Sequence, residues 1–345
     1  MDIDTLAAAF PDASGYLNTA SLGLPASAGV EAIERHLGQW RAGRCDPPDF
    51  DDDVERSRRA YARIVGVAAS SVAAIGQVSV ATGLVASSIP DGARVLCAEE
   101  DFTSVLFPFL ADRRLDVQVV PLDRVLDSIT PDIDLVAVSA VQSADGRRLD
   151  LDALAGIAAD AGARTFVDIT QAAGWVELDA GRFDVTACGA YKWLCCPRGA
   201  GFMTVNDSAS DWIVPRHANW YAGDDPWTSI YGPPLRLSEQ ARRFDTSPAW
   251  IAWVGSAPAV ELLAEAGPGV IGSHDVALAN ALLDRLGLPP SDSAIVAVDT
   301  PHAEALTAAG IRSAGRAGKV RLSFHHYNTI DDVELVADLL GAADR

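Results

Sequence analysis

Two residues with clear chemical potential, Asp168 and Lys192, stand in neighbouring segments of the chain. Asp168 follows the apolar run 165–167, at the place where open α/β sheets put ligand-binding groups. An ionised carboxylate buried there needs a partner. Lys192 stands between Tyr191 and Trp193. Because apolar surroundings lower the pKa of an ammonium group, this lysine is suited to imine formation.

A structural explanation of the same two residues is also open. Asp168 and Lys192 can form a structural ion pair, or the lysine stem can carry its ammonium group to the surface. For an isolated lysine in an α/β protein this explanation is the better one. The motifs around the two residues favour chemistry instead.

Short apolar runs alternate with helical patterns before residue 245. The expected elements are strands at 95–98, 117–120, 135–139 and 165–168 and a helix at 151–161. Valine-rich strands separated by helices predict an α/β fold with a mostly parallel sheet covered on both faces. The uncharged stretch 64–90 is rich in Ser, Thr and Gly, which indicates a buried strand, loop and helix rather than a membrane span.

After residue 245 the helical patterns lengthen. The expected elements are helices at 250–266, 273–286 and 331–340 and strands at 295–298 and 320–323. This pattern predicts a second, smaller α+β unit. We therefore expect a large domain of residues 15–245 and a small domain of residues 246–345 together with 1–14.

Composition limits the classes of partner. The chain has 345 residues, with 47 acidic and 27 basic side chains and a net charge of −20. Nucleic acids and anionic membranes are therefore poor partners. The five cysteines form neither a disulfide framework nor a metal-ligand spacing, so we expect no metal. Residues 1–10 contain no basic region typical of a targeting signal, and we expect a cytoplasmic protein.

An acidic run at 49–53 precedes Arg56, Arg58 and Arg59. A helix dipole favours acids in the first turn and bases later. We therefore expect a capped surface helix here rather than a metal site. His325 and His326 are expected to be turn residues rather than ligands or bases.

Common nucleotide-binding and hydrolase motifs are absent from the sequence. No G-x-G-x-x-G follows a strand, and no P-loop, H-E-x-x-H or G-x-S-x-G pattern occurs. Gly199 and Gly201 lack a third glycine and indicate flexible backbone between two strands. A nucleotide-binding dehydrogenase on a similar open sheet is therefore a weaker alternative.

The motif Asp168-x-x-Gln171 followed by Tyr191-Lys192 resembles the class V aminotransferase family of pyridoxal-phosphate enzymes. Further matching segments are 16–23, 141–146 and 320–323. This family has the type I fold and includes cysteine desulfurases, kynureninases and isopenicillin-N-epimerase-like proteins. The resemblance implies a mostly parallel, seven-stranded type of sheet in the large domain and pyridoxal 5′-phosphate as the cofactor.

The resemblance also implies how the cofactor ring is held. Lys192 would be the Schiff-base lysine, and Asp168 would pair with the pyridinium nitrogen so that the ring acts as an electron sink. Gln171 would hydrogen-bond the phenolic oxygen of the cofactor, and Gln142 would belong to the same site. Phe102 falls where the family stacks an aromatic residue or histidine on the ring, although ordinary core packing explains it equally well.

The phosphate of the cofactor is expected at the start of an apolar helix. Gln77, Val78 and Ser79 open this helix, and their amides and the Ser79 hydroxyl can hold an anion there. A simple N-cap at Ser79 is compatible with this role. Tyr191 is expected to donate to the phosphate, whereas Gly189 replaces a phosphate-binding serine of many relatives.

Substrate and subunit contacts follow from the same resemblance. Arg321 would grip the α-carboxylate of the substrate with two hydrogen bonds, unless it is a surface arginine on a strand. Asn18 is assigned to the substrate site with it. Residues 245–248, with Thr246, resemble the segment by which a neighbouring subunit completes the phosphate site. A homodimer with shared active sites would follow, although a Ser/Thr/Pro turn is a simpler explanation.

We therefore expect an enzyme that acts on an amino acid or related amine through a Lys192 aldimine, with transamination as the default reaction. A lyase that eliminates a β or γ group, or an epimerase without a catalytic cysteine, is an alternative. A non-catalytic binding or regulatory protein is another, and the intact set of site residues argues against it. Because no cysteine follows Cys196, we do not expect a cysteine desulfurase that forms a protein persulfide.

Overall fold

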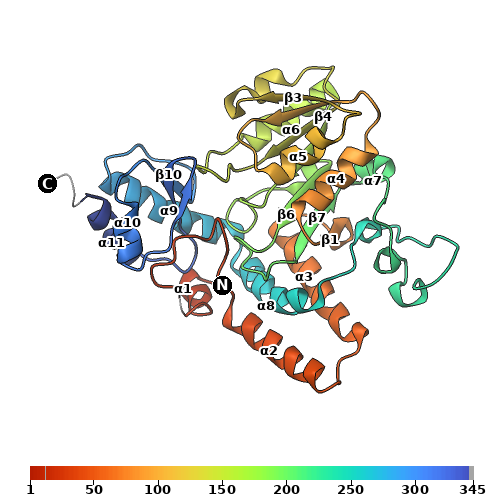
Figure 1. Ribbon diagram of the computed structural model, residues 1–345, viewed down its shortest axis with the longest axis horizontal. Coiled ribbons are helices and arrows are strands. Elements are labelled where there is room, and N and C mark those ends of the chain that lie inside the picture. The colour runs from red at the N-terminus through yellow and green to blue at the C-terminus, as the bar shows by residue number, and fades with distance from the viewer. Residues whose placement is uncertain (12, 342–345) are drawn as a thin grey trace.

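A computed structural model describes residues 1–11 and 13–341, which form two β-sheets with their own helices (Figure 1). The larger sheet contains β1 (Val72–Ile75), β2 (Arg94–Ala98), β3 (Asp116–Val120), β4 (Leu135–Ser139), β5 (Arg164–Asp168), β6 (Val185–Gly189) and β7 (Gly201–Val205). Its strand order is β1-β7-β6-β5-β4-β2-β3. β7 runs antiparallel to both neighbours, and the other neighbouring strands pair in parallel. The predicted α/β fold with a mostly parallel sheet is confirmed.

Helices cover both faces of the larger sheet. The helices of the chain are α1 (Ile3–Ala7), α2 (Ser27–Arg41), α3 (Asp51–Ile64), α4 (Val78–Ser88), α5 (Thr103–Ala111), α6 (Leu151–Ala161), α7 (Asp207–Trp212), α8 (Trp250–Ala266), α9 (Pro268–Arg285), α10 (Ala303–Ala308) and α11 (Ile330–Gly341). In β4, Val136 and Val138 face a core shared with α3, α6 and α8. Leu135 and Ala137 face the opposite core, shared with α4 and α5. This double burial explains why the strands have near-continuous apolar sequences.

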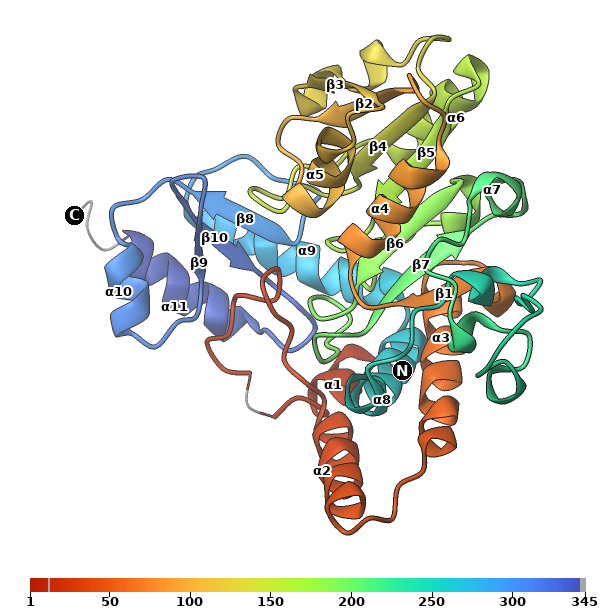
Figure 2. The ribbon, with the colours of Figure 1, turned by 45° about the vertical axis from the view of Figure 1, so that its right-hand side comes forward.

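A smaller antiparallel sheet has the order β8-β10-β9. Its strands are β8 (Ile295–Val298), β9 (Ala314–Arg316) and β10 (Lys319–Ser323). Figure 2 shows these strands beside α10 and α11, with α9 extending towards the larger sheet. Leu278, Val296, Leu322 and Val336 share one apolar core in this unit.

The sequence predicted most element bounds within one or two residues, but α9 begins five residues earlier than expected. Gly267 has a φ of +85° and ends α8, and Pro268 occupies the first turn of α9. Proline is favoured there because its fixed φ suits a helix start. The division of the chain at residues 245 and 246 stays a prediction, and its small part includes Asp12 and residues 342–345, which lie outside the described residues.

The acidic run at 49–53 opens α3, as expected, but one of the following arginines is not on the surface. Arg58 is only 2% exposed because it shares a helix face with the buried Val54 and Tyr61. Its Nη2 lies 2.7 Å from Oδ2 of Asp245. Nor does a side chain cap α3: the residue before it, Phe50, makes no such hydrogen bond.

The carboxyl ends of β4, β5 and β6 meet at one edge of the larger sheet. Ser139, Asp168 and Gly189 are the last residues of these three strands. This edge is the place where ligands bind in open α/β sheets. Among the described residues, no helix combines the length and apolar character needed to cross a bilayer.

Candidate active site

A cavity opens at this edge and encloses about 710 Å³, including its opening to solvent. The α4 N-terminus, the ends of β4 to β6 and the loops that follow them form its walls. The residues expected at the site that line it are Gln77, Val78, Phe102, Asp168, Gln171, Tyr191 and Lys192. Of the other candidates, Ser79, Gln142, Thr246, Arg321 and Asn18, none lines the cavity directly in the described part of the chain.

Lys192 is 5% exposed, and burial lowers the pKa of its amine to about 8. The negative charge of Asp168 acts in the opposite direction, and the positive charge of Arg321 lowers the pKa further. Burial raises the pKa of the Asp168 carboxyl, while a 2.8 Å hydrogen bond from the Thr170 N–H and the charge of Lys192 oppose the rise. Within residues 1–11 and 13–341, Asp168 and Lys192 form no ion pair at 4.0 Å or less, so the direct structural pair is wrong.

Gln171 connects three segments around Lys192. Its Nε2 donates to the Ala20 carbonyl and to the Ser143 hydroxyl, each at 3.0 Å. Its Oε1 accepts a 2.7 Å hydrogen bond from the indole N–H of Trp193. The expected contact with a phenolic oxygen therefore requires Gln171 to exchange one of these partners, and it stays a prediction.

Phe102 precedes α5 and lines the cavity. Its side chain is 48% exposed, so its interpretation as core packing is wrong. The centre of its ring lies 5.3 Å from Nζ of Lys192. This position is compatible with a ring that stacks on a planar ligand held at the lysine.

The start of α4 is a site for an anion. Gln77 occupies the N-cap position but makes no side-chain cap, and Ser79 lies inside the helix, so the predicted N-cap at Ser79 is wrong. In the described part of the chain, the N–H groups of Val78 and Ser79 have no hydrogen-bond acceptor. Free amides at a positive helix end favour a phosphate group. A lysine, a carboxylate and this anion site around one cavity fit pyridoxal phosphate.

The absence of a side chain at Gly189 has a steric reason. A Cβ there would lie 3.1 Å from Cε1 of Tyr191 and 3.5 Å from Cγ2 of Thr170. The Tyr191 ring would therefore have to shift by a few tenths of an ångström to accommodate a serine at this position.

Gln142, expected to bind the cofactor, lies behind the cavity wall and is fully buried. Its Nε2 donates to Asp101 at 2.8 Å, and the backbone N–H of Ser139 donates to both oxygens of the same carboxylate. Burial raises the pKa of Asp101 to about 6, and the nearby charge of Asp168 adds to the rise. Sequence reasoning missed Asp101, although an acid just after the strand β2 was a usable signal.

Arg321 is 1% exposed, so its interpretation as a surface arginine is wrong. It donates to the Ser143 carbonyl and, at 2.6 Å, to the Ser21 hydroxyl. Its Nε has no acceptor, and no carboxylate of the described residues lies within 4.0 Å of it. Burial, with help from Arg316, lowers the pKa of the guanidinium to about 10. A buried cation without an anion is costly, so this position suits an incoming carboxylate.

Asn18 lies in the same N-terminal segment as Ser21, which accepts a hydrogen bond from Arg321. Its backbone pairs with Ser323 in a bridge that leads from β10 to the N-terminal segment. Its Oδ1 is buried without a partner in the described part of the chain. An unsatisfied buried oxygen in this segment indicates a place for a polar ligand.

Thr246 lies away from the cavity of its own chain. Its backbone N–H donates to the Ala74 carbonyl at 2.9 Å, and the preceding Asp245 is tied to Arg58 and to the Ala74 N–H. These bonds fix the segment against β1. Its expected role in a neighbouring subunit stays a prediction.

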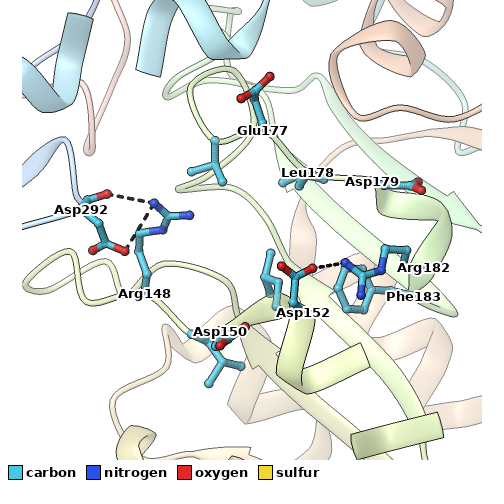
Figure 3. A pocket seen from close by; sticks show the side chains of 12 residues that line it. Arg148, Asp150, Asp152, Glu177, Leu178, Asp179, Arg182, Phe183 and Asp292 are labelled. Atoms are coloured by element: carbon cyan, nitrogen blue, oxygen red, sulfur yellow. Dashed lines mark hydrogen bonds and ion pairs between the residues drawn. The ribbon is translucent and has the colours of Figure 1, made fainter. Parts of the chain in front are cut away.

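A second, larger hollow of about 1220 Å³ lies elsewhere on the molecule (Figure 3). Its arginines are paired: Arg148 with Asp292 and Arg182 with Asp152. It has no lysine among its lining residues. Both of its arginines are already paired and its other charged residues are acidic, so it lacks the reactive set found around Lys192.

Cys195, His325 and His326 place ligand-type atoms within 4.8 Å of one another, although no metal was expected. Both nitrogens of His325 are already engaged, Nδ1 at 2.9 Å from Asp275 Oδ2 and Nε2 at 2.9 Å from the Trp193 carbonyl. The two histidines occupy a turn, as expected, but are buried. His325 therefore supports the backbone next to Lys192.

Comparison with known proteins agrees with this geometry. The sequence model of the aminotransferase class-V family matches residues 76–313. The chain is 28% identical over 316 residues to the uncharacterised aminotransferase YcbU of Bacillus subtilis, covering 84% of each chain. It is 28% identical over 290 residues to isopenicillin N epimerase of Streptomyces clavuligerus, covering 74% of this chain and 70% of that one.

A solved structure shares the fold. A variant of the lyase C-DES with glycine covalently linked to its pyridoxal-phosphate cofactor superposes with a TM-score of 0.85 at 18% identity, over 96% of this chain and 98% of that one. The type I fold expected from the sequence is thereby confirmed. Together with the matched family model, these findings show that the chain belongs to the class V aminotransferase family and that pyridoxal 5′-phosphate is its cofactor.

Proposed function

We propose that this protein is a transaminase that takes the amino group from an α-amino acid or a related amine. The observation that carries the proposal is that Lys192 and Asp168 line one cavity that also has an anion site at a helix start. Arg321 lies behind the wall of this cavity and donates to Ser143, which lines it. Each of these groups matches one part of the reaction.

When bound, the cofactor supplies an electron sink that stabilises negative charge at the substrate α-carbon. Asp168 would hold a proton on the pyridine nitrogen, which keeps the sink effective. The Thr170 N–H, 2.8 Å from Oδ1, helps to keep the carboxylate ionised in spite of its burial.

Lys192 would hold the cofactor through its amine and, once released by the substrate, would carry the proton at the substrate α-carbon. A base is most effective when its pKa is near the working pH. A lysine whose pKa is lowered to about 8 meets this condition, whereas an exposed lysine near 10.5 does not.

Arg321 would bind the α-carboxylate of the substrate. Its Nη1 and Nη2 point to Ser143 and Ser21, and both serines can rotate towards an incoming carboxylate. A bidentate arginine contact fixes the orientation of the α-carbon relative to Lys192.

We also propose that the active enzyme is a cytoplasmic homodimer in which Thr246 of each chain completes the phosphate site of the other. Thr246 lies outside its own cavity. Large apolar side chains are exposed near the cavity on α5, at Phe107 and Leu110, and on the loop that contains Tyr231. Exposed apolar surface of this kind supports an interface.

The experiment that tests the function is an absorbance titration of the cofactor-loaded protein with single amino acids, followed by product analysis. Formation of a 2-oxo acid with the amino group retained on the protein supports transamination. Release of ammonia with a β or γ fragment indicates a lyase, and loss of optical activity alone indicates an epimerase. No spectral change with any amine indicates a binding protein.

A further inference from the structure

Arg198 lines the cavity, although no motif singled it out. It lies in the turn between β6 and β7, and its Cζ is 5.0 Å from the centre of the Tyr191 ring. The same turn lies close to the start of α4. The Gly199 carbonyl oxygen is 4.0 Å from the position that a Cβ atom would occupy on Gly76. Arg198 is therefore at the end of the cavity where the free amides of Val78 and Ser79 are found.

In the part of the chain that the structure describes, the charge of Arg198 has no protein partner. The chain carries 47 acidic side chains against 27 basic ones, and arginines near the cavity such as Arg147 are paired with acids. In residues 1–11 and 13–341, no carboxylate oxygen lies within 4.0 Å of the Arg198 guanidinium. An unpaired arginine in so acidic a protein is available for an external anion.

Two anions could reach this cavity: the phosphate of the cofactor and a carboxylate on the substrate. The guanidinium of Arg321, which carries the substrate proposal, is held by Ser21 and Ser143. Arg198 instead lines the cavity together with Gln77 and Val78 at the start of α4. Helix amides and an arginine together form a site for a dianion. The position of Arg198 therefore favours the phosphate.

We propose that Arg198 binds the cofactor phosphate and that the Tyr191 ring holds its guanidinium in place. This arrangement replaces the serine contact that Gly189 cannot provide, because a side chain at Gly189 would crowd Tyr191. The planar fork of arginine can give two hydrogen bonds to phosphate oxygens, while stacking on the aromatic ring restricts its orientation. The inference rests on the cofactor assigned above.

The test compares Arg198→Ala and Arg198→Lys with the wild type by equilibrium dialysis of the cofactor-free protein. The ligands are pyridoxal phosphate and pyridoxal, which lacks the phosphate. Arg164→Ala is the matched control, because Arg164 also stacks on an aromatic ring, with its Cζ 4.4 Å from the Trp212 ring centre, but lies at the opposite end of β5 from Asp168.

We expect Arg198→Ala to weaken binding of pyridoxal phosphate by about ten- to a hundredfold, the range for hydrogen bonds to a charged group, and to leave binding of pyridoxal unchanged. Arg198→Lys should fall between, and Arg164→Ala should match the wild type. Inorganic phosphate should also compete less well against pyridoxal phosphate for Arg198→Ala than for the wild type.

Three results would overturn the proposal. In the first, Arg198→Ala and the wild type bind pyridoxal phosphate equally well, but the cofactor-loaded variant binds a dicarboxylic amino acid more weakly. Arg198 would then bind the substrate rather than the cofactor phosphate. Equal losses for pyridoxal and pyridoxal phosphate would mean that Arg198 supports the ring site. A wild type that binds neither compound would refute the cofactor itself as well as this role for Arg198.

Discussion

The lowered pKa of Lys192 leads to a quantitative prediction. At pH 7.5, an amine with a pKa of about 8 is about one-quarter neutral, whereas an amine at 10.5 is about 0.1% neutral. Lys192 in the cofactor-free protein should therefore be roughly 200-fold richer in the reactive neutral form than an ordinary lysine at this pH.

The neighbouring charges predict shifts of opposite sign. Asp168 raises the pKa of Lys192, so Asp168→Asn should move it below about 8. Arg321 lowers this pKa, so Arg321→Ala should move it upward. In the wild type the largest cause of the lowered pKa is burial, which penalises the ammonium form.

The assay is competitive acetylation of the cofactor-free protein over a pH series, read by mass spectrometry of tryptic peptides. The sequence makes this assay unusually clean, since Lys192 and Lys319 are the only lysines of the chain. Acetylated Lys192 appears in a peptide that ends at Arg198, and the exposed Lys319 serves as the internal reference.

Two outcomes would refute this account of the site. A labelling midpoint near 10.5 for Lys192 would show that burial does not control its protonation. Shifts of the same sign in Asp168→Asn and Arg321→Ala would show that these two charges do not act on the amine through space.

Other variants give distinct outcomes. Asp168→Asn should lose bound cofactor on dialysis, which is seen as a fall in the cofactor absorbance. Arg321→Ala should keep a near-normal cofactor spectrum but need a higher concentration of α-amino acid to change that spectrum. Equal cofactor loss in both variants would mean that Arg321 is structural. Asp245→Ala should lower the urea-measured free energy of unfolding by about 3–5 kcal/mol, because it removes the buried partner of Arg58 and leaves only the more exposed Glu55. A loss under about 1 kcal/mol would contradict this. Burial raises the pKa of the Cys196 thiol to about 12, so this residue is a poor nucleophile. Turnover with cysteine should therefore leave no persulfide on the protein by mass spectrometry, and Cys196→Ala should stay active.

The parts of the structure that depend on local patterns were predictable. Buried valine-rich strands revealed the parallel sheet, and the position of Asp168 after one of them located the edge that holds the cavity. The alternation Val320, Arg321, Leu322 correctly placed the arginine on the face opposite to the core. Periodicity of two and of 3.6 is directly visible in a sequence.

The parts that depend on non-local packing were not predictable. Arg58 has the sequence context of a surface helix, but it lies on the buried face of α3 and pairs there with Asp245 from a distant segment. The segment that contains Arg198 lies near the start of α4 because β7 pairs with β1, with Ile75 opposite Gly201. Such pairings carry no local signal, and charged residues in a sequence are usually exposed.

The same limit applies to Gln142. Its motif implied a cofactor contact, whereas in the structure its amide N–H donates a hydrogen bond to Asp101 behind the wall of the cavity. A family motif can therefore mark a residue that positions the site rather than one that touches the ligand. Phe102 is the opposite case, since only its exposure separates a ring at the cavity from a core side chain.

The most direct test of the central claim is borohydride reduction of the cofactor-loaded protein, followed by peptide mapping. We predict one stable cofactor adduct, on Lys192, and its loss in Lys192→Ala with an unchanged circular dichroism spectrum. An adduct on Lys319, or persistence of the adduct in Lys192→Ala, would contradict the assignment of the site.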